Sequence, residues 1–438
     1  MKLSQLSSIA FLAVVVAACS SASTEGGFGD PGTSSGGNGS SGGGSSGGGS
    51  SGGGSSGGTS SGGSFGSFGD GGGSSSGGTS SGCQYNDSTD HDGDGFSGTD
   101  GDCNDCDPNS NPGAFDVPKN GIDEDCDGKA DDEPTGCDSQ AVLDSTDPFN
   151  AALAMDLCRK TTETATGKQR TWGVVGADFI APDGTSTCGG GACSSNANYA
   201  LGHGNLTKLG PNAPQNGGTH MLGLSSGTAR DPTDTGYKNV SGFDKGYTTS
   251  AAPGYPAPAP ACPGVVTGQP HDGAAVRLTI RVPTNAQSFT FNSNFFSYEF
   301  PNYICSTYND TFVVEMAPAP TGASTGGNIA FDQSGNPISV NNALLQACTA
   351  QTAGGKQFTC PLGPSSLTGT GFAGHAATGW LQTQVNVDTS LKGKDITIVF
   401  AVWDSGDGIL DSTALVDNFE WSIQPGQNTP VTQPNPAQ

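Results

Sequence analysis

A run of glycine and serine between residues 20 and 82 sets the limit on what this chain can fold into. These 63 residues (82 − 19) are nearly all Gly and Ser, with repeats such as Ser-Ser-Gly-Gly-Gly, and offer no apolar surface to bury. We expect a random-coil tether with an average end-to-end distance of roughly 45 Å, from about 5–6 Å times the square root of the residue number. The folded part of this 438-residue chain is therefore expected beyond residue 82.

The first 19 residues have the order of an export signal. A single lysine, Lys2, precedes an apolar run over residues 9–16, and the small residues Ala17 and Ala18 lead to Cys19. This order is typical of a signal peptide, and the apolar run is too short for a stable membrane span. An ordinary signal peptide that ends in Ala-x-Ala is one interpretation.

The stretch Val16-Ala17-Ala18-Cys19 also resembles the bacterial lipobox. The resemblance implies that residues 1–18 are removed and that Cys19 is acylated, which would attach the chain to a lipid bilayer. Two or three acyl chains together hold far better than one. By the sorting rule of that family, Ser20 implies the outer membrane. We therefore expect a surface-exposed outer-membrane lipoprotein in which residues 19–82 form the lipidated cysteine and its tether.

Charge is acidic and unevenly distributed. The formal net charge is −25, which argues against nucleic acid and against anionic membrane surfaces as partners. Residues 83–138 hold 17 of the 41 acidic residues and only two lysines, so this segment sums to 2 − 17 = −15. So much like charge in a short stretch needs a compensating cation to fold.

The cysteine count agrees with export. Of 13 cysteines, twelve remain when Cys19 is set aside, an even number as a disulfide framework requires. Two expected pairs close short loops, a third ties the acidic segment together, and a fourth fixes the following helix to it. These pairs are Cys188–Cys193, Cys348–Cys360, Cys103–Cys126 and Cys137–Cys158, respectively.

Two runs in the acidic segment follow the pattern D-x-D-x-D-G: Asp90-His91-Asp92-Gly93-Asp94-Gly95 and Asp123-Glu124-Asp125-Cys126-Asp127-Gly128. Alternate spacing points three carboxylates into one loop, and the sixth-place glycine permits a sharp turn. Neither run completes an EF-hand, so flanking acids must finish the ligand set; either run alone could be a solvated acidic turn. The expected metal ligands of a module over residues 83–137 are Asp90, Asp92, Asp94, Asp102, Asp105, Asp107, Asp123, Asp125, Asp127 and Asp131.

The acidic segment resembles the MopE-like metal-binding motif of bacterial surface proteins and is similar in layout to thrombospondin calcium repeats. The matching stretches are Asp92-Gly93-Asp94-Gly95-Phe96, Gly101-Asp102-Cys103-Asn104-Asp105-Cys106, Asn111-Pro112-Gly113-Ala114 and residues 120–128. Cys106 is additional to that pattern, so its partner stays open. The family is sometimes labelled copper-binding, but copper prefers imidazole and sulfur, and His91 is the only histidine nearby. We expect Ca²⁺ rather than copper.

Residues 138–425 are expected to form an antiparallel β-sandwich of jelly-roll type. Asp147-Pro148 predicts the start of a short entry helix over residues 149–160. The stretch Val276-Arg277-Leu278-Thr279-Ile280-Arg281-Val282 alternates between apolar and polar, as in a half-buried strand. Residues 426–438 are expected to be a disordered tail. The predicted strands span residues 172–181, 220–224, 276–282, 288–296, 311–316, 380–387, 396–403 and 413–421.

Several motifs in this region resemble the surface-protein domain called choice-of-anchor L. They include the stretch from Phe295 to Tyr303, Tyr308-Asn309-Asp310-Thr311-Phe312, Asp404-Ser405-Gly406-Asp407-Gly408 and Val416-Asp417-Asn418-Phe419. The resemblance implies placement on a secreted or anchored bacterial protein and no agreed enzyme activity.

A glycine-rich turn between the last two predicted strands carries three acids within eight residues. Asp404, Asp407 and Asp411, together with Asp417, could hold a second metal ion. The alternative is a hairpin turn whose aspartates cap backbone amides.

One stretch fits a hydrolase motif. Gly223-Leu224-Ser225-Ser226-Gly227 matches G-x-S-x-G, but the residues that follow cannot form the helix that a nucleophile elbow needs. The favoured interpretation is a calcium-stabilised surface protein for adhesion, binding or display, without enzyme activity and with an unknown extracellular glycan or protein as ligand. A surface hydrolase using Ser225 is the alternative.

Overall fold

The computed structural model describes residues 83–188 and 191–436. The expected signal peptide, the acylated Cys19 and the Gly/Ser tether lie outside the described residues. Within the described part, no helix is both long enough and apolar enough to cross a membrane.

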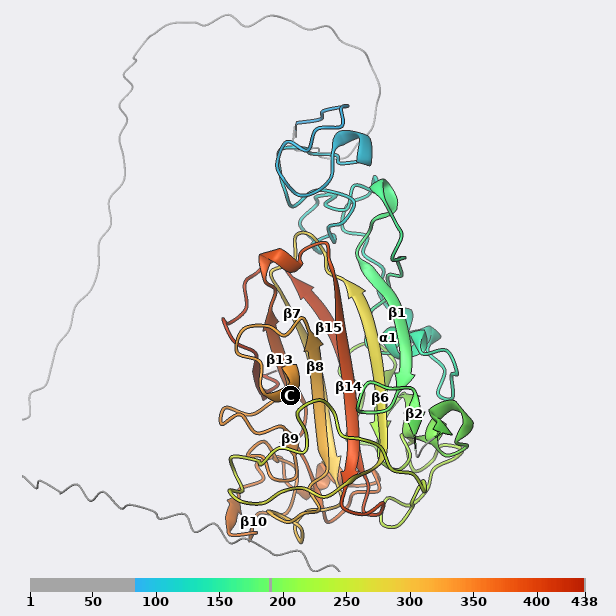
Figure 1. Cartoon of the computed structure of the whole chain (residues 1–438), viewed down its shortest axis with the longest axis vertical. Helices are drawn as coiled ribbons and strands as arrows, with labels where there is room; N and C mark the ends of the chain where they lie inside the picture. The colour runs from blue at the N-terminus through green and yellow to red at the C-terminus, as the bar shows by residue number, and fades with distance from the viewer. Residues whose placement is uncertain (1–82, 189–190, 437–438) are drawn as a thin grey trace, which may run out of the picture. The chain divides into compact units, whose positions relative to one another are not determined.

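Two antiparallel sheets dominate the fold (Figure 1). The first sheet has the order β1 (Gly173–Ile180), β6 (Pro270–Arg281), β14 (Asp395–Ser405), β8 (Thr311–Ala317) and β9 (Ile338–Ser339). The second has the order β16 (Val431–Pro434), β13 (Leu381–Asn386), β7 (Ser288–Ser297), β15 (Ser412–Ser422), β5 (Met221–Ser225) and β4 (His203–Leu206), with β12 (Ala376–Ala377) also paired to β7.

Regular structure outside these sheets is short. Two small hairpins pair β2 (Thr187–Cys188) with β3 (Gly191–Ala192) and β10 (Gln351–Ala353) with β11 (Lys356–Phe358). One α-helix, α1 (Phe149–Leu153), is described. The 3₁₀ turns are η1 (Gly98–Asp100), η2 (Cys137–Gln140), η3 (Gly167–Gln169), η4 (Cys193–Ser195), η5 (Tyr199–Gly202), η6 (Thr325–Gly327), η7 (Pro364–Leu367) and η8 (Thr389–Leu391).

The core lies between the two sheets, and successive long strands alternate between them: β6, β7 and β8 in one run, β13, β14 and β15 in the other. Phe291 of β7 meets Phe400 of β14 edge to face, with ring centroids 5.5 Å apart. The alternation expected in β6 is present, since Leu278 is buried while Arg277 is partly exposed. Arg281 departs from it, because its Nε donates to Asp395 Oδ1 (2.9 Å) and the side chain is buried by that pairing. The mainly-β antiparallel sandwich is confirmed.

The entry helix is much shorter than predicted. Asp147 caps it as expected, since its Oδ1 accepts the Phe149 amide (3.0 Å), but the helix ends at Leu153 and not at residue 160. Asp156 takes a left-handed conformation (φ 67°), which breaks the helical path. The chain then runs beside β1, where Lys160 bridges to Val174.

The tail after residue 425, by contrast, contains more regular structure than predicted. Residues Val431–Pro434 form β16, which extends the second sheet by pairing with β13. Thr432 is buried, and its hydroxyl lies 2.9 Å from that of Thr383. Pro434 can end this strand because an edge strand has one side free of ladder hydrogen bonds. The expectation of a wholly disordered 426–438 segment is therefore wrong for these four residues.

The acidic segment packs directly on the sandwich. Phe115 belongs to the main core, and its backbone exchanges two hydrogen bonds with the Asn285 side chain (3.1 and 2.8 Å). Asn111 accepts the Thr284 hydroxyl proton at 2.8 Å. The acidic segment has too few apolar residues to form a core of its own. Packing Phe115 into the sandwich core gives it part of the apolar burial that it needs to fold.

All twelve cysteines of the described chain form disulfides. Four pairs are those that the sequence suggested: Cys103–Cys126, Cys137–Cys158, Cys188–Cys193 and Cys348–Cys360. Two further pairs had no sequence signal of their own. They are Cys83–Cys106, which gives the additional Cys106 its partner, and Cys262–Cys305.

Candidate metal centre

The first acidic loop closes around its own carboxylates. Asp90 accepts the amides of Gly93 (2.6 Å) and Gly95 (3.0 Å), and Asp94 Oδ1 accepts the Phe96 amide (2.8 Å). Both glycines have φ near +90°, a conformation that side-chain-bearing residues rarely adopt. The D-x-D-x-D-G spacing thus produces a tight loop with its acids turned inward.

Two flanking acids join this loop. Asp102 Oδ1 accepts the Asn104 amide (2.7 Å), and Asp105 Oδ1 accepts the His91 amide (2.7 Å). Carboxylate oxygens of Asp92, Asp102 and Asp105 lie within 4.8 Å of one another. Carboxylates this close repel unless a cation or protons separate them.

The decisive feature of the first loop is a set of buried oxygens without donors. The Oδ2 atoms of Asp92, Asp94, Asp102 and Asp105 are all buried and accept no hydrogen bond. Burial and the charges of Asp92 and Asp102 raise the pKa of Asp94 to about 7. Burial and neighbouring carboxylates likewise raise the pKa of Asp102 to about 6. Four buried oxygens left over after the backbone is satisfied match the needs of a hard divalent cation.

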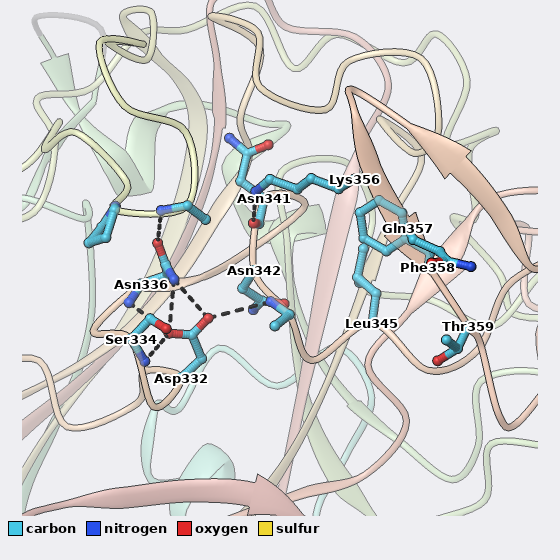
Figure 2. A pocket seen from close by; sticks show the side chains of 13 residues that line it. Asp332, Ser334, Asn336, Asn341, Asn342, Leu345, Lys356, Gln357, Phe358 and Thr359 are labelled. Carbon is cyan, nitrogen blue, oxygen red and sulfur yellow. Dashed lines mark hydrogen bonds between the residues drawn. The ribbon is translucent and has the colours of Figure 1, made fainter. Parts of the chain in front are cut away.

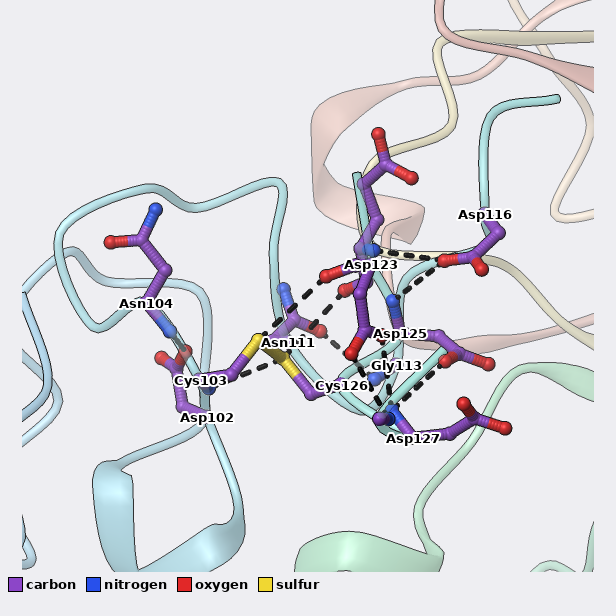
Figure 3. Close-up of a disulfide and its surroundings, with 12 residues drawn as sticks. Asp102, Cys103, Asn104, Asn111, Gly113, Asp116, Asp123, Asp125, Cys126 and Asp127 are labelled. Carbon is purple, nitrogen blue, oxygen red and sulfur yellow. Dashed lines mark hydrogen bonds between the residues drawn. A yellow bond between two sulfur atoms is a disulfide. The ribbon is translucent and has the colours of Figure 1, made fainter. Parts of the chain in front are cut away.

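The second loop repeats the geometry of the first. Asp123 Oδ2 accepts the Gly128 amide at 3.0 Å, as Asp90 Oδ2 accepts that of Gly95, and Asp125 Oδ1 accepts the Asp127 amide at 3.1 Å. Asp116 closes the loop from outside, since its Oδ1 accepts the amides of Glu124 and Asp125 (Figure 3). Oxygens of Asp116, Asp125 and Asp132 form one close group, and those of Asp123, Asp125 and Asp127 another.

The two loops differ in one important way. Arg159 Nη2 lies 2.7 Å from Asp125 Oδ2 and 3.2 Å from Glu133 Oε1, so the second loop already holds a positive charge. Burial raises the pKa of Glu133 to about 7, and Arg159 opposes that rise. The first loop has no such internal cation among the described residues.

A disulfide joins the two loops. Figure 3 shows Cys103 and Cys126 bonded between Asp102 on one side and Asp125 and Asp127 on the other. Because every cysteine of the described chain is in a disulfide, no thiolate is available there as a copper ligand. One imidazole is close: His91 groups with Asp87 and Asp105. Oxygen dominates the donor set.

Some expected ligands lie outside these groups, and others were missed. Asp131 is exposed and accepts the amides of Asn120 and Gly121, which makes it a turn cap. Asp107 accepts both nitrogens of Asn109 at the rim of the first loop. Asp116 was missed because it stands seven residues before the second run, outside any loop spacing. Asp116 comes close to the second loop only when the chain is folded.

The four acids of the possible second site do not stay together. Asp404 and Asp411 are buried at the ends of β14 and β15, and Asp407 lies partly buried in the turn between them. Asp417 is six residues further along β15 than Asp411, about 20 Å at the rise of a strand. Its Oδ2 accepts the amides of Asn216 and Gly217, so the expectation that it completes this site is wrong.

Ser225 is placed unlike a nucleophile. It ends β5, is fully buried, and donates to Ser412 O (3.1 Å), with the Thr413 hydroxyl at 2.9 Å. Among the described residues no hydrogen bond joins it to a histidine; His375 bonds to Phe300 O (2.6 Å) and stacks on Tyr298. A serine that is buried from solvent and has no hydrogen bond to a histidine does not have the geometry of a G-x-S-x-G nucleophile.

A polar pocket of about 580 Å³ opens beside β11 (Figure 2). Asp332 accepts the Asn336 side chain at 2.8 and 2.9 Å, and Lys356 Nζ donates to Asn341 O (2.9 Å). The buried Asn342 Nδ2 has no hydrogen-bond acceptor. Trp380 and Trp403 are buried, at 7% and 1% exposure, so neither offers the stacking face expected of a sugar-binding sheet.

The fold described above is that of a β-sandwich protein, and comparison with known proteins adds a metal-binding motif in its acidic segment. The family described as "Putative metal-binding motif" (Cu-binding MopE) matches residues 102–132, the span between the two loops and across the second. No curated protein matches the chain.

Two solved structures align with 57% of the chain. The carbohydrate-binding module TmCBM27, studied for specific mannan recognition, aligns at 10% identity and a TM-score of 0.21 over 86% of its length. The K2 cleaved adhesin domain of Lys-gingipain aligns at 13% identity and a TM-score of 0.20 over 89% of its length. Likenesses this low carry no argument about what this chain binds.

Proposed function

We propose that this chain is a calcium-stabilised, lipid-anchored surface protein that presents a β-sandwich for adhesion or ligand binding. The observation that carries the calcium part is the set of four buried, donor-free carboxylate oxygens in the first loop. Asp92, Asp94, Asp102 and Asp105 would hold the ion, with Asp90 shaping the loop. The match of the metal-binding family to residues 102–132, which include Asp102 and Asp105, supports metal binding in this segment and leaves the choice of ion to the donor chemistry.

Calcium fits this donor set better than copper does. It takes six to eight oxygen ligands at about 2.3–2.6 Å from carboxylates, carbonyls and water, and tolerates flexible loops. Copper favours nitrogen and sulfur, and the described acidic segment offers one imidazole and no thiolate. The ion's role is structural: it neutralises acids that otherwise repel, so its binding energy becomes folding energy.

The acidic segment connects this ion to the sandwich. Phe96 is buried between Gly113 and Arg170, whose guanidinium lies 5.5 Å from its ring, and Phe115 enters the main core. Closure of the first loop fixes Phe96 directly, because Asp94 accepts its amide. We infer that calcium rigidifies the segment through which the tether would join the folded domain.

The polar pocket is the proposed ligand site. Its Asn341, Asn342 and Lys356 side chains and the Asp332 carboxylate suit a ligand rich in hydroxyls or amides, such as a glycan or an extended peptide. Membrane attachment rests on the sequence of the first 19 residues, and the lipoprotein and choice-of-anchor L assignments remain part of this proposal.

Calcium titration of the mature chain tests the metal assignment. Extracellular calcium modules bind at about 10⁻⁴–10⁻³ M, so millimolar calcium should stabilise by roughly 1 kcal/mol per site. Melts in EDTA, calcium and magnesium are compared for the parent, Asp92→Asn and Asp131→Asn. The exposed Asp131 loses the same charge outside the cluster. Asp92→Asn should therefore lose the part of the calcium gain that comes from the first loop, and Asp131→Asn should keep the whole gain. Identical melts of the parent in all three solutions, with no heat of binding, would reject the proposal.

A glycan and protein array tests the binding assignment. The parent should bind a polar ligand, Asn342→Ala should weaken that binding, and Gln333→Ala, which alters an exposed side chain next to the pocket, should not. Equal binding by both variants would place the ligand elsewhere on the domain.

A further inference from the structure

A second group of acids gathers where four core strands begin or end. β7 ends at Ser297 opposite Ser412 at the start of β15, and Thr311 at the start of β8 lies opposite Trp403 near the end of β14. The first pair belongs to one sheet and the second pair to the other. Carboxylates that follow or precede these positions therefore meet at one end of the sandwich. They are Glu299, Asp310, Asp404 and Asp411, with exposures of 1%, 0%, 0% and 1%.

Most oxygens of these carboxylates have no hydrogen-bond donor. Both oxygens of Asp404, both of Asp411, Asp310 Oδ2 and Glu299 Oε2 are buried and unpartnered. The Ser405 amide donates to Asp310 Oδ1 (3.1 Å), and that bond leaves the rest of the group unsatisfied. An unpaired buried carboxylate costs several kcal/mol, so this arrangement requires a positive partner or protons.

The turn itself does not satisfy these acids. Asp407 Oδ1 accepts the Ile409 amide (3.2 Å), as a turn-capping aspartate does. Asp404 and Asp411, by contrast, accept no amide. The hairpin-cap interpretation therefore holds for Asp407 alone.

One lysine approaches the group from one side. Lys245 is buried, donates from Nζ to Ser225 O (2.8 Å), and its charge acts on Asp411 and Asp272. Burial, together with the charges of Asp310 and Asp407, holds the pKa of Glu299 well above its ordinary value. Burial and the charge of Asp407 likewise raise the pKa of Asp310, and the Ser412 side chain and the Ser405 amide oppose that rise. Lys245 thus offsets Asp411 and, to a smaller extent, Asp404. Among the described residues, no basic side chain is seen to act on Glu299 or Asp310.

We propose that Glu299, Asp310 and Asp404 form a second cation site, completed by Asp407 from the turn, that takes a hard divalent ion of the calcium type. The donors are oxygens only, and they come from both sheets. A cation there ties the β14–β15 turn to the segment between β7 and β8, which closes this end of the sandwich. The site shares no residue with the acidic loops, so it stands or falls separately from calcium binding there.

Metal analysis of a protein whose first loop is disabled gives the direct test. The chain carrying Asp92→Asn and Asp94→Asn is loaded with calcium, gel-filtered and analysed for bound metal, and the same protein is titrated by calorimetry. The expected result is at least one ion per chain that Asp404→Asn removes and Asp388→Asn, an exposed acid of the same domain, does not. Because the second loop could also retain an ion, the loss on Asp404→Asn is the decisive comparison.

A chain in which the acids share protons instead would behave differently. Asp404→Asn would then leave the bound-metal count unchanged, and calcium would not shift the melt of the loop-disabled protein, which overturns the proposal. Glu299→Gln provides a second variant if Asp404→Asn fails to fold in EDTA. If neither variant folds, absence of any ion in the folded loop-disabled parent still rejects the site.

Discussion

Arg159 and Asp125 form an ion pair at 2.7 Å between the strand-bearing domain and the second acidic loop. The Asp125 side chain is almost fully buried, with 1% exposure, and that of Arg159 is 16% exposed. The guanidinium also packs over the Trp172 ring, 5.4 Å from its centroid. The two loops share a motif and a similar hydrogen-bond pattern but differ in charge balance. Arg159 partly neutralises the carboxylates of the second loop, and no described basic residue does so in the first.

Replacing Arg159 should make the second loop depend on calcium. Arg159→Gln leaves Asp125 and Glu133 as neighbouring buried acids, and we expect a loss of about 3 kcal/mol in EDTA, the low end for a broken buried pair. Millimolar calcium should recover part of this loss. Urea denaturation in EDTA and in calcium measures both values, with Arg159→Lys as the charge-preserving control. Equal losses in the two solutions would show that the loop cannot take up an ion.

Breaking the Cys103–Cys126 disulfide should weaken calcium binding as well as stability. The bond holds the two loops together across 23 residues, and removing it as a Ser/Ser pair should cost about 2–4 kcal/mol. Calcium affinity should fall because Asp102, next to Cys103, is no longer positioned against the first loop. Cys188–Cys193, replaced in the same way, is the control and should leave the calcium titration unchanged. An unaltered calcium titration of the Cys103/Cys126 variant would show that the disulfide does not position the calcium ligands.

Much of the sandwich could be predicted because its strands alternate in the period of a half-buried sheet. Val276 to Val282 shows that period clearly. The structure of two segments could not be predicted from the sequence pattern. The helix after Pro148 ends at Leu153, and the left-handed Asp156 prevents it from continuing. The sequence of β16 is polar and contains a proline, and it forms a strand because it pairs with β13.

The loops were predictable for a different reason: their ligands are local in sequence and glycine is needed at fixed places. Asp116 and Arg159 were not, because each reaches the second loop by tertiary folding. The strand-end acids fall between these cases. Asp404, near the end of β14, and Asp407, in the turn that follows, are three residues apart in the sequence. Glu299 and Asp310 join them only through the strand registers of both sheets.

Lipid attachment is tested by Cys19→Ser. If the lipobox resemblance is right, the variant should leave the membrane fraction, because a chain without acyl groups keeps no anchor. An unprocessed or wrongly processed precursor should accumulate beside it. Fractionation of cells followed by mass spectrometry of the first residue measures both. A variant that still sediments with membranes would place the anchor elsewhere.

Ser225→Ala tests the hydrolase alternative. Ser225 is buried and bonded to Ser412 O, so we expect no ester- or peptide-hydrolysing activity in the parent and none to lose in the variant. A fluorophosphonate probe that labels reactive serines should leave the native chain unmarked. Labelling at Ser225 that the alanine variant abolishes would reverse this conclusion.

The last prediction concerns pH and a single buried acid away from both metal sites. Glu315 on β8 is 9% exposed, its Oε1 has no hydrogen-bond donor, and burial raises its pKa from 4.5 to about 8. The folded chain therefore keeps this proton between about pH 4.5 and 8 while the unfolded chain loses it. Stability is highest at the acid end of this window and declines as pH rises through it.

Glu315→Gln removes this titration while keeping the shape of the side chain. The stability of the variant relative to the parent should rise between pH 5 and pH 8.5, by on the order of 2 kcal/mol. That figure is well under 1.36 kcal/mol per pKa unit because the residue keeps 9% of its surface exposed to solvent. Urea denaturation at four pH values measures the change, and Glu163→Gln, the same substitution at an exposed position, should give a flat difference. Parallel stability curves for Glu315→Gln and the parent would mean that the pKa of Glu315 in the folded chain is the ordinary value of a glutamate.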